Sequence, residues 1–329
     1  MPLPKMKRLA SLVEEAEHIA LISHINPDGD AAGSLLGLYQ ALSDLGKKVT
    51  PVLLDGVPRA FLFLTGSDKV TSRLPNLEET DLCILLDAND VSRSGLGDDL
   101  RAFGKAGKLG CIDHHPKGDI YQYAQATTHD ESASSTSEMV YTFLKDIGAR
   151  FTPSVSTALL TGIYTDTGGF QFSNTSNKTL EITAELMRRG ARLQRIVREI
   201  ANSKSIASLK LLGYALERMK VVLHGQGVIS ALTNEDIQET KANSDDISGI
   251  IGNLNTVPGV AFSMLLSEMQ PGVIRGSLRA VDGRGVNVGR LAKLLGGGGH
   301  PKASGFALPS SLVTTEKGWK VVAPEEKTR

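Results

Sequence analysis

Short apolar runs alternate with amphipathic stretches over the first half of the chain. Runs rich in β-branched and aliphatic residues occupy positions 18–23, 48–54, 81–87 and 108–113. Helical spacing of apolar positions appears over 31–46, 132–148, 154–167 and 177–191. Alternation of this kind predicts an α/β fold, a doubly wound and mainly parallel sheet with helices on both faces.

The pattern changes near residue 192. Two helical segments, 193–203 and 205–219, predict a helical connector over 192–220 between a first domain at 1–191 and a second at 221–329. The second domain shows a hairpin signal at 224–227, strand patterns at 259–269 and 272–280, and helical patterns at 245–257 and 286–295. These features predict a smaller α+β domain.

Composition agrees with two globular domains, because 329 residues with 41% hydrophobic content can bury two cores. Lys plus Arg and Asp plus Glu both number 36, so no global positive field favours long nucleic acid or a membrane. The N-terminus matches neither a signal peptide nor a membrane span, and we expect a cytoplasmic protein. Cys83 and Cys111 lie in apolar runs and are interpreted as core residues.

Acidic and imidazole side chains cluster where the predicted strands end. His24, Asp28 and Asp30 follow the first strand, Asp87 follows a later one, and Asp113, His114 and His115 follow another, while Asp166 ends a helical run. Ligands of doubly wound folds bind at the carboxyl ends of strands, so these side chains are expected to converge on one edge of the sheet.

Each residue also has an ordinary explanation. Asp28 and Asp30 could be turn residues or helix caps, Asp87 a strand-end cap and His114 a surface histidine. Four gathered carboxylates would, however, raise one another's pKa unless cations compensated, and two divalent ions balance four carboxylates. Carboxylate and imidazole ligands suit Mn²⁺, with Mg²⁺, Co²⁺ or Zn²⁺ as substitutes, and the lack of thiolates argues against structural zinc.

The second domain has a candidate anion site. Residues 296–305 include Gly297, Gly298, Gly299 and His300, and consecutive glycines can let backbone N–H groups cradle a phosphate or carboxylate. One glycine there could instead be a helix C-cap. Upstream, Arg275 and Arg279 share one strand face and could bind a terminal phosphate, although a solvated strand face is the alternative.

The segments SHINPDGDAAGS, LLDAND, IDHHP and TDTGGF occur in this order and resemble the four motifs of the DHH phosphoesterase superfamily. GGGGH is similar to the GGGH motif of the companion DHHA1 domain. The resemblance implies one metal held by Asp30, Asp87, His114 and Asp166, a second held by His24, Asp28 and Asp87, and His115 beside the scissile phosphate. We expect Asp113 to orient the histidines or to cap its strand.

The pairing of the two domains resembles the NrnA type of oligoribonuclease and 3′-phosphoadenosine 5′-phosphate (pAp) phosphatase. The resemblance implies hydrolysis of short oligoribonucleotides, including linear dinucleotides, and removal of the 3′-phosphate of pAp. The expected nucleophile is a hydroxide shared by two metals, and the expected partners are a short RNA or nucleotide with a terminal phosphate and, as an open possibility, a second copy of the chain.

Three alternatives have discriminating features. RecJ-like single-strand exonucleases share these motifs but normally carry additional nucleic-acid-binding domains, for which this chain has little room. Family II pyrophosphatases share the first domain without the GGGH motif. A non-catalytic nucleotide-binding module would be expected to lack ligands, whereas all six are present here.

Overall fold

The computed structural model describes residues 4–201, 205–247, 249–281, 283–299, 301–316 and 318–323. The chain divides into two compact units, Met1–Ser203 and Lys204–Arg329. The two helices expected in a connector fall in different units, because α7 (Leu193–Ala201) packs in the first and α8 (Ile206–Glu217) in the second. Each unit is described separately below.

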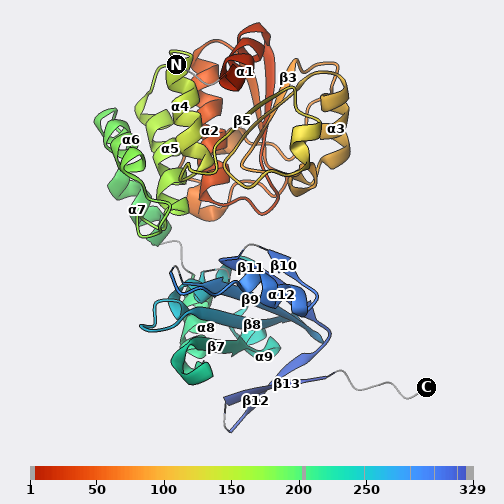
Figure 1. The fold of residues 1–329 in the computed structure, drawn as a ribbon, viewed down its shortest axis with the longest axis vertical. Helices are drawn as coiled ribbons and strands as arrows, with labels where there is room; N and C mark the ends of the chain where they lie inside the picture. The colour runs from red at the N-terminus through yellow and green to blue at the C-terminus, as the bar shows by residue number, and fades with distance from the viewer. Residues whose placement is uncertain are drawn as a thin grey trace, which may run out of the picture. The chain divides into compact units, whose positions relative to one another are not determined.

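The first unit contains a five-stranded sheet in the order β2-β1-β3-β4-β5, with every neighbouring pair parallel (Figure 1). The strands are β1 (His18–Ile22), β2 (Lys48–Val52), β3 (Leu82–Leu86), β4 (Leu109–Asp113) and β5 (Ala126–His129). The predicted α/β class is confirmed. The edge strand β5 was not predicted, because four residues with two threonines give no clear hydrophobic pattern.

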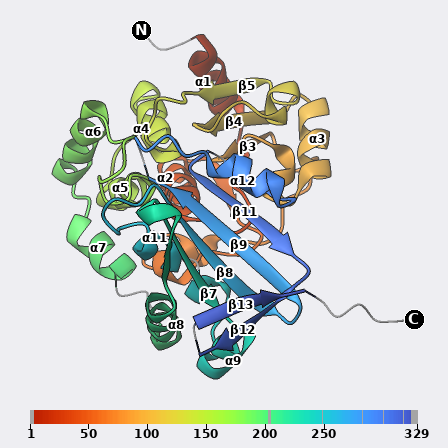
Figure 2. The same ribbon diagram turned by 60° about the horizontal axis from the view of Figure 1, so that its bottom comes forward.

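Helices cover both faces of this sheet (Figures 1 and 2). They are α1 (Pro4–Glu15), α2 (Gly29–Asp44), α3 (Gly97–Lys105), α4 (Thr136–Asp146), α5 (Pro153–Asp166), α6 (Asn177–Arg188) and α7, with 3-10 turns η1 (Arg59–Phe61), η2 (Ser67–Lys69), η3 (Val91–Ser94) and η4 (Asp119–Gln122). Alternate residues of β1 enter different cores, Ile19 and Leu21 on one face and Ala20 and Ile22 on the other. Both faces are therefore buried, as a parallel sheet requires.

Glycines bring α2 and α5 close together. A Cβ on Gly33 would lie 2.6 Å from the carbonyl oxygen of Ala158, and one on Gly29 would lie 2.3 Å from Oγ1 of Thr165. Side chains at these two positions would push the helices apart. The contact places the carboxyl end of α5 beside the amino end of α2, where two predicted metal ligands lie.

The second unit is built on a mixed six-stranded sheet in the order β10-β11-β9-β8-β7-β6, in which β7 and β8 are parallel and the other pairs antiparallel. Its strands are β6 (Lys220–Val222), β7 (Gly227–Leu232), β8 (Phe262–Gln270), β9 (Val273–Ala280), β10 (Gly298–Gly299) and β11 (Ala303–Leu308), with a separate hairpin of β12 (Ser311–Thr315) and β13 (Gly318–Val322). The predicted hairpin at 224–227 joins β6 to β7 through η5 (Leu223–Gly225).

The helices of this unit are α8, α9 (Asn234–Thr240), α10 (Ser244–Ile247), α11 (Ile250–Leu254) and α12 (Val288–Leu294). The single helix predicted over 245–257 is thus two short helices, with Gly249 as the residue before the second. Glycine weakens a helix, which agrees with the break at this position. Among the described residues, no helix combines the length and apolar character needed to cross a membrane.

Candidate metal centre

The cluster lies where the strand order of the first unit reverses. β1 and β3 are neighbours, and their connections leave toward opposite sides of the sheet, which creates a crevice at their carboxyl ends. His24 follows β1 by two residues, and Asp87 directly follows β3. Asp87 has a backbone φ of 58°, in the left-handed region, so the chain turns abruptly at this residue.

Asp28 and Asp30 belong to the start of α2. Oδ1 of Asp28 accepts the backbone N–H groups of Asp30 and Ala31, each at 3.0 Å, so Asp28 is the helix N-cap. Asp28 is exposed and can cap the helix while facing the cluster, whereas Asp30 is buried. The capping explanation is therefore correct for Asp28 without excluding a ligand role.

Two histidines bridge neighbouring carboxylates. Nε2 of His24 lies 3.4 Å from Oδ2 of Asp87 and 4.0 Å from Oδ1 of Asp28. Nε2 of His114 lies 3.7 Å from Oδ1 of Asp87 and 3.6 Å from Oδ2 of Asp166. In the part of the chain that the structure describes, potential ligand atoms within 4.8 Å of one another form three groups: His24, Asp28 and Asp87; Asp30, His114 and Asp166; and Asp87, His114 and His115.

The histidine rings are oriented by backbone carbonyls. Nδ1 of His24 lies 2.8 Å from the carbonyl oxygen of Ile25, and Nδ1 of His114 lies 3.3 Å from that of Ala133. A proton on Nδ1 satisfies each contact and leaves the Nε2 lone pair directed toward the carboxylates. Metal-binding histidines commonly have this arrangement, so the rings fit a divalent cation.

The amino end of α4 holds two of the carboxylates. Backbone N–H groups of Thr136 and Ser137 donate to the two oxygens of Asp30, at 2.6 and 2.9 Å, and the hydroxyl of Thr136 donates to Oδ1 of Asp87 at 3.0 Å. Ser135 is the N-cap of this helix. A helix N-terminus stabilises negative charge, so α4 partly compensates the buried Asp30.

Crowding of carboxylates shifts their acidity. Burial, followed by the charges of Asp30 and Asp28, raises the pKa of Asp166 to about 8. Burial and the charges of Asp30, Asp28 and Asp166 hold the pKa of Asp87 well above its ordinary range, and burial also raises the pKa of Asp30. These groups repel one another when ionised, so the site fits cations that would neutralise them.

His115 has different contacts from His114. Its Nδ1 lies 2.8 Å from Oδ1 of the buried Asp113 and 3.6 Å from Oδ1 of Asp87. The backbone of the same loop is held by His129, whose Nε2 lies 2.7 Å from the carbonyl oxygen of His115, and by Asn89, whose amide donates to the carbonyl of Pro116 at 2.8 Å. Sequence reasoning did not identify either positioning residue.

Two family models match the chain. The model of the DHH family, N-terminal domain, matches residues 18–163, and the model of the DHHA1 domain matches residues 224–317. The bifunctional oligoribonuclease and PAP phosphatase NrnA of Thermus thermophilus is 31% identical over 305 residues, covering 92% of this chain and 88% of the relative. The chain belongs to the DHH family. The predicted resemblance is confirmed.

Further comparisons extend the DHH assignment over both units. The enzyme of the same name from Bacillus subtilis is 30% identical over 304 residues, covering 89% of this chain and 90% of the relative. The crystal structure of an exopolyphosphatase-related protein from Bacteroides fragilis has a TM-score of 0.84 at 30% identity, covering 92% of this chain and 90% of that one. The similarity includes the DHHA1 region as well as the DHH domain.

In the DHHA1 region, Arg275 and Arg279 are exposed on one face of β9, as the alternation predicted. The glycine segment lies in the same sheet, since β10 pairs with β11 and β11 pairs with β9. A Cβ on Gly297 would lie 2.1 Å from the carbonyl oxygen of Gly305, and Gly299 has a φ of 132°. Close packing against β11 therefore explains why Gly297 and Gly299 are glycines. His300 lies outside the described residues.

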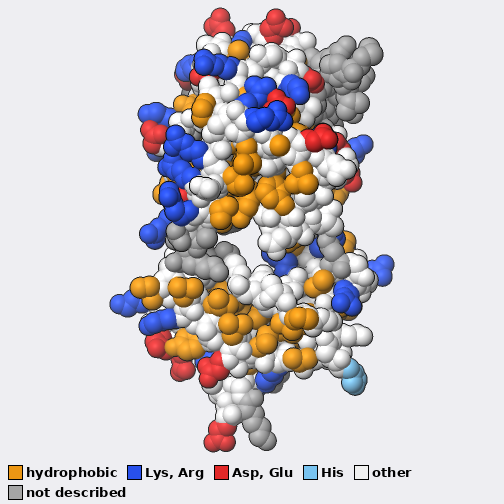
Figure 3. Space-filling view, turned by 90° about the vertical axis from the view of Figure 1, so that its left-hand side faces the viewer, with side chains coloured by type: hydrophobic (Ala, Val, Ile, Leu, Met, Phe, Trp, Pro, Cys, Tyr) orange, Lys and Arg blue, Asp and Glu red, His pale blue; other side chains and the backbone are white. Residues whose placement is uncertain are grey.

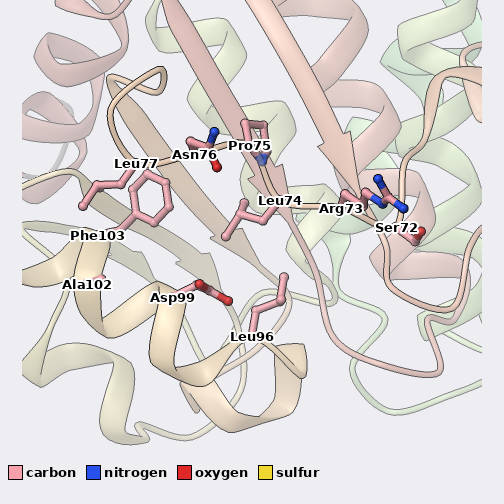
Figure 4. Close-up of a pocket in the computed structure, with 10 residues that line it drawn as sticks. All are labelled: Ser72, Arg73, Leu74, Pro75, Asn76, Leu77, Leu96, Asp99, Ala102 and Phe103. Carbon is pink, nitrogen blue, oxygen red and sulfur yellow. The ribbon is translucent and has the colours of Figure 1, made fainter.

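A surface hollow of about 410 Å³ lies elsewhere in the DHH unit, between the segment 72–77 and α3 (Figure 4). Its lining includes Leu74, Leu77 and Phe103, with Arg73 and Asp99 on exposed positions. None of its lining residues belongs to the carboxylate and histidine cluster. The hollow is consequently separate from the candidate metal centre.

Proposed function

We propose that this protein is a phosphoester hydrolase that cleaves short oligoribonucleotides, including linear dinucleotides, and removes the 3′-phosphate of pAp. The observation that carries the proposal is the gathering of four aspartates, with Asp87 among them, and two histidines at the switch point of the sheet. The names of the NrnA relatives, oligoribonuclease and PAP phosphatase, support the choice of substrate.

We propose two divalent cations for this centre, Mn²⁺ being favoured by the mixed oxygen and imidazole donors. As the family resemblance implies, one would be held by Asp30, Asp87, His114 and Asp166, and the other by His24, Asp28 and Asp87. His24, Asp28 and Asp87 form one group of neighbouring ligand atoms, and Asp30, His114 and Asp166 form another, while Asp87 lies beside His114 in a third. When bound, the two cations supply the positive charge that acidifies a water molecule and neutralises the phosphate.

The chain's own residues position the reacting groups. Nδ1 of His115 contacts Asp113, and an N–H group at Nδ1 donates a hydrogen bond to that carboxylate. Nε2 can then donate a hydrogen bond to a phosphate oxygen only when both ring nitrogens carry a proton, that is, when the ring is an imidazolium. We propose that His115 stabilises charge developing on the phosphate, and that Asp113 fixes the orientation of its ring.

A second part of the proposal concerns substrate length. Arg275, Arg279, Gly297, Gly298, Gly299 and His300 are proposed to bind the terminal phosphate of a short ligand. Two exposed arginines on one strand face, in the same sheet as the glycines, support this role. The net charge of zero favours a short ligand over long nucleic acid.

The test is an assay in Mn²⁺ with pAp, a 5′-phosphorylated diribonucleotide, pyrophosphate, polyphosphate and single-stranded DNA in parallel. We expect turnover of pAp and of the diribonucleotide, and Asp87→Asn should abolish both activities. Polyphosphate is included because one similar structure is named exopolyphosphatase-related. Turnover restricted to pyrophosphate or polyphosphate would overturn the proposed substrates.

A further inference from the structure

Two buried polar atoms of the first unit have no hydrogen-bond partner in the part of the chain that the structure describes. They are Oδ2 of Asp113 and the hydroxyl oxygen of Tyr121. Figure 3 shows Lys, Arg, Asp and Glu side chains at the surface of this unit, where water can solvate them, but the two atoms lie inside it. A buried polar atom without a hydrogen bond destabilises the fold, so each of these atoms calls for an explanation.

The two side chains lie on the same face of the parallel sheet. Cys111 and Asp113 are alternate residues of β4, and Cys111 belongs to the hydrophobic core on that face. Tyr121, in η4, packs against the same core. Burial, and after it interactions with Cys111, Asp113 and Glu131, raise the pKa of Tyr121. The phenol therefore keeps its proton at neutral pH and can donate a hydrogen bond, and Asp113 is close enough to interact with it.

Tyr121 adjoins the two residues that hold His115. Oδ1 of Asp113 lies 2.8 Å from Nδ1 of the His115 ring, and Nε2 of His129 lies 2.7 Å from the carbonyl oxygen of His115. The ring of Tyr121 packs edge-on against that of His129, with 5.4 Å between the ring centroids. Asp113 and His129 are themselves paired residues of β4 and β5. Tyr121 is thus next to both the support of the His115 ring and the support of its backbone.

Asp113 is the acceptor that best suits the Tyr121 hydroxyl. The thiol of Cys111 is another neighbour of the phenol on this face, but sulfur is a weak acceptor. A carboxylate oxygen accepts strongly, and Oδ2 of Asp113 is left over by the contact of Oδ1 with His115. The two buried oxygens are not in direct hydrogen-bond contact with each other. A water molecule between them would satisfy both.

We propose that the hydroxyl of Tyr121 donates a hydrogen bond, through one bridging water molecule, to Oδ2 of Asp113, and that Tyr121 is thereby a positioning residue for His115. With Oδ2 held in this way, the carboxylate does not rotate away from Nδ1 of the His115 ring. Small displacements of a catalytic group lower turnover strongly, so a support one residue removed still affects the rate. The inference rests on the proposed function for the role of His115 in turnover.

The first test measures turnover of pAp. Tyr121→Phe removes only the hydroxyl and keeps the ring against His129, so kcat should fall about tenfold while KM and Mn²⁺ affinity stay unchanged. In a His115→Ala background the same substitution should cause no further loss, because Tyr121 acts through that histidine. Tyr123→Phe, which removes a nearby hydroxyl that interacts with Arg101, is the matched control and should keep full activity. An equal fall of kcat in both backgrounds overturns the proposal.

The second test does not depend on turnover. The ring signals of His115 in NMR spectra of the cation-free protein, labelled at histidine, are assigned by their loss in His115→Ala. Tyr121→Phe should shift these signals and Tyr123→Phe should not, and both variants should melt within about 3 °C of the wild type. A wild type that turns over neither pAp nor the diribonucleotide refutes the proposed function. Unmoved His115 signals, or an unchanged kcat, in Tyr121→Phe refute this inference alone.

Discussion

Asp87 sits between the two histidines that define the centre, 3.4 Å from one imidazole nitrogen and 3.7 Å from the other. Its left-handed backbone and its buried carboxylate are both unfavourable for the fold taken alone. The negative charges of the surrounding aspartates make ionisation of Asp87 still more unfavourable and hold its pKa well above the ordinary value. The conformation and burial of Asp87 thus lower the stability of the cation-free fold, and the proposed cations would offset this loss.

Replacement of Asp87 by asparagine should therefore stabilise the cation-free protein. Asp87→Asn removes one buried negative charge, and we expect its melting temperature at pH 8 with chelator to rise by about 2 to 8 °C. Added Mn²⁺ should raise the melting temperature of the wild type but not of the variant. The exposed Asp44→Asn is the control, and a variant less stable than wild type in chelator would contradict the repulsion argument.

His115 and Asp87 should separate turnover from cation affinity. His115→Ala removes the proposed phosphate contact, and we expect Mn²⁺ affinity to persist while kcat falls roughly 100- to 1,000-fold. Asp87→Ala should lose both. Calorimetric titration with Mn²⁺ beside the pAp assay measures the two effects. Because His115 also groups with Asp87 and His114, equal loss of affinity in both variants would assign it as a ligand instead.

Residues that follow strands were predictable from sequence, whereas those that hold them were not. His24 and Asp87 end apolar runs, and the general position of ligands in α/β folds is sufficient to predict that they lie together. The residues that hold the ligands and the loop form hydrogen bonds to groups distant in sequence. The backbone N–H of Thr136 donates to the carboxylate of Asp30, and the side chains of Asn89 and His129 contact backbone carbonyls of the loop after β4. No spacing rule relates a hydrogen-bond donor to a carbonyl in another element, so only the folded geometry identifies them.

At the level of elements, the loop after β4 is clamped from several sides. The backbone N–H of Ile120 donates to the carbonyl of Asn89, and a Cβ on Gly118 would lie 2.3 Å from that same oxygen. The loop carrying His115 is thus pressed against the segment after β3. Catalytic geometry of this kind tolerates little displacement.

Gly118→Ala should consequently impair catalysis more than folding. We expect kcat to fall roughly 10- to 100-fold as the loop shifts, and the melting temperature to fall by a few degrees, because the added Cβ would overlap backbone atoms of Asn89. Gly252→Ala, in α11 with open space at its Cβ, is the control and should keep full activity. Unchanged kcat in Gly118→Ala would show that the loop adapts.

Elements with strong periodicity were predicted well, and short or polar ones were not. The apolar runs that became β1, β3 and β4 are buried on both faces, which produces an unambiguous pattern. β5 and β10 are short and rich in threonine or glycine, and their strand character comes from pairing with a neighbour. Tertiary context decides such segments.

For the whole molecule, the raised carboxylate pKa values predict a characteristic dependence on pH. A carboxyl with a raised folded-state pKa stabilises the fold at low pH, and the contribution is lost as pH rises through that value. For Asp166 the window runs from its ordinary 3.8 to about 8. Groups with lowered pKa, such as Glu138 and Asp81, have the opposite effect, because their contribution to stability is present above their ordinary pKa and is lost as pH falls.

Cation-free protein should therefore lose stability between about pH 5 and pH 8, and Mn²⁺ should restore it at the upper end. Urea unfolding in chelator at both pH values, repeated with Mn²⁺, measures the free energy of unfolding. Apparent Mn²⁺ affinity should rise over the same interval, because binding displaces protons from the cluster. Equal free energies of unfolding at pH 5 and pH 8 in chelator would contradict the argument that repulsion among the ionised carboxylates calls for cations.

The candidate ligands extend from residue 24 to residue 166 and come from the loop after β1, the start of α2, the residues that follow β3 and β4, and the end of α5. No short stretch of the chain carries a complete group, unlike a zinc finger, whose ligands are close in sequence. The cations therefore cannot nucleate folding, since their site exists only after long-range contacts have formed. Cation affinity is in this protein a measure of completed tertiary structure, and isolated peptides containing single motifs should bind weakly.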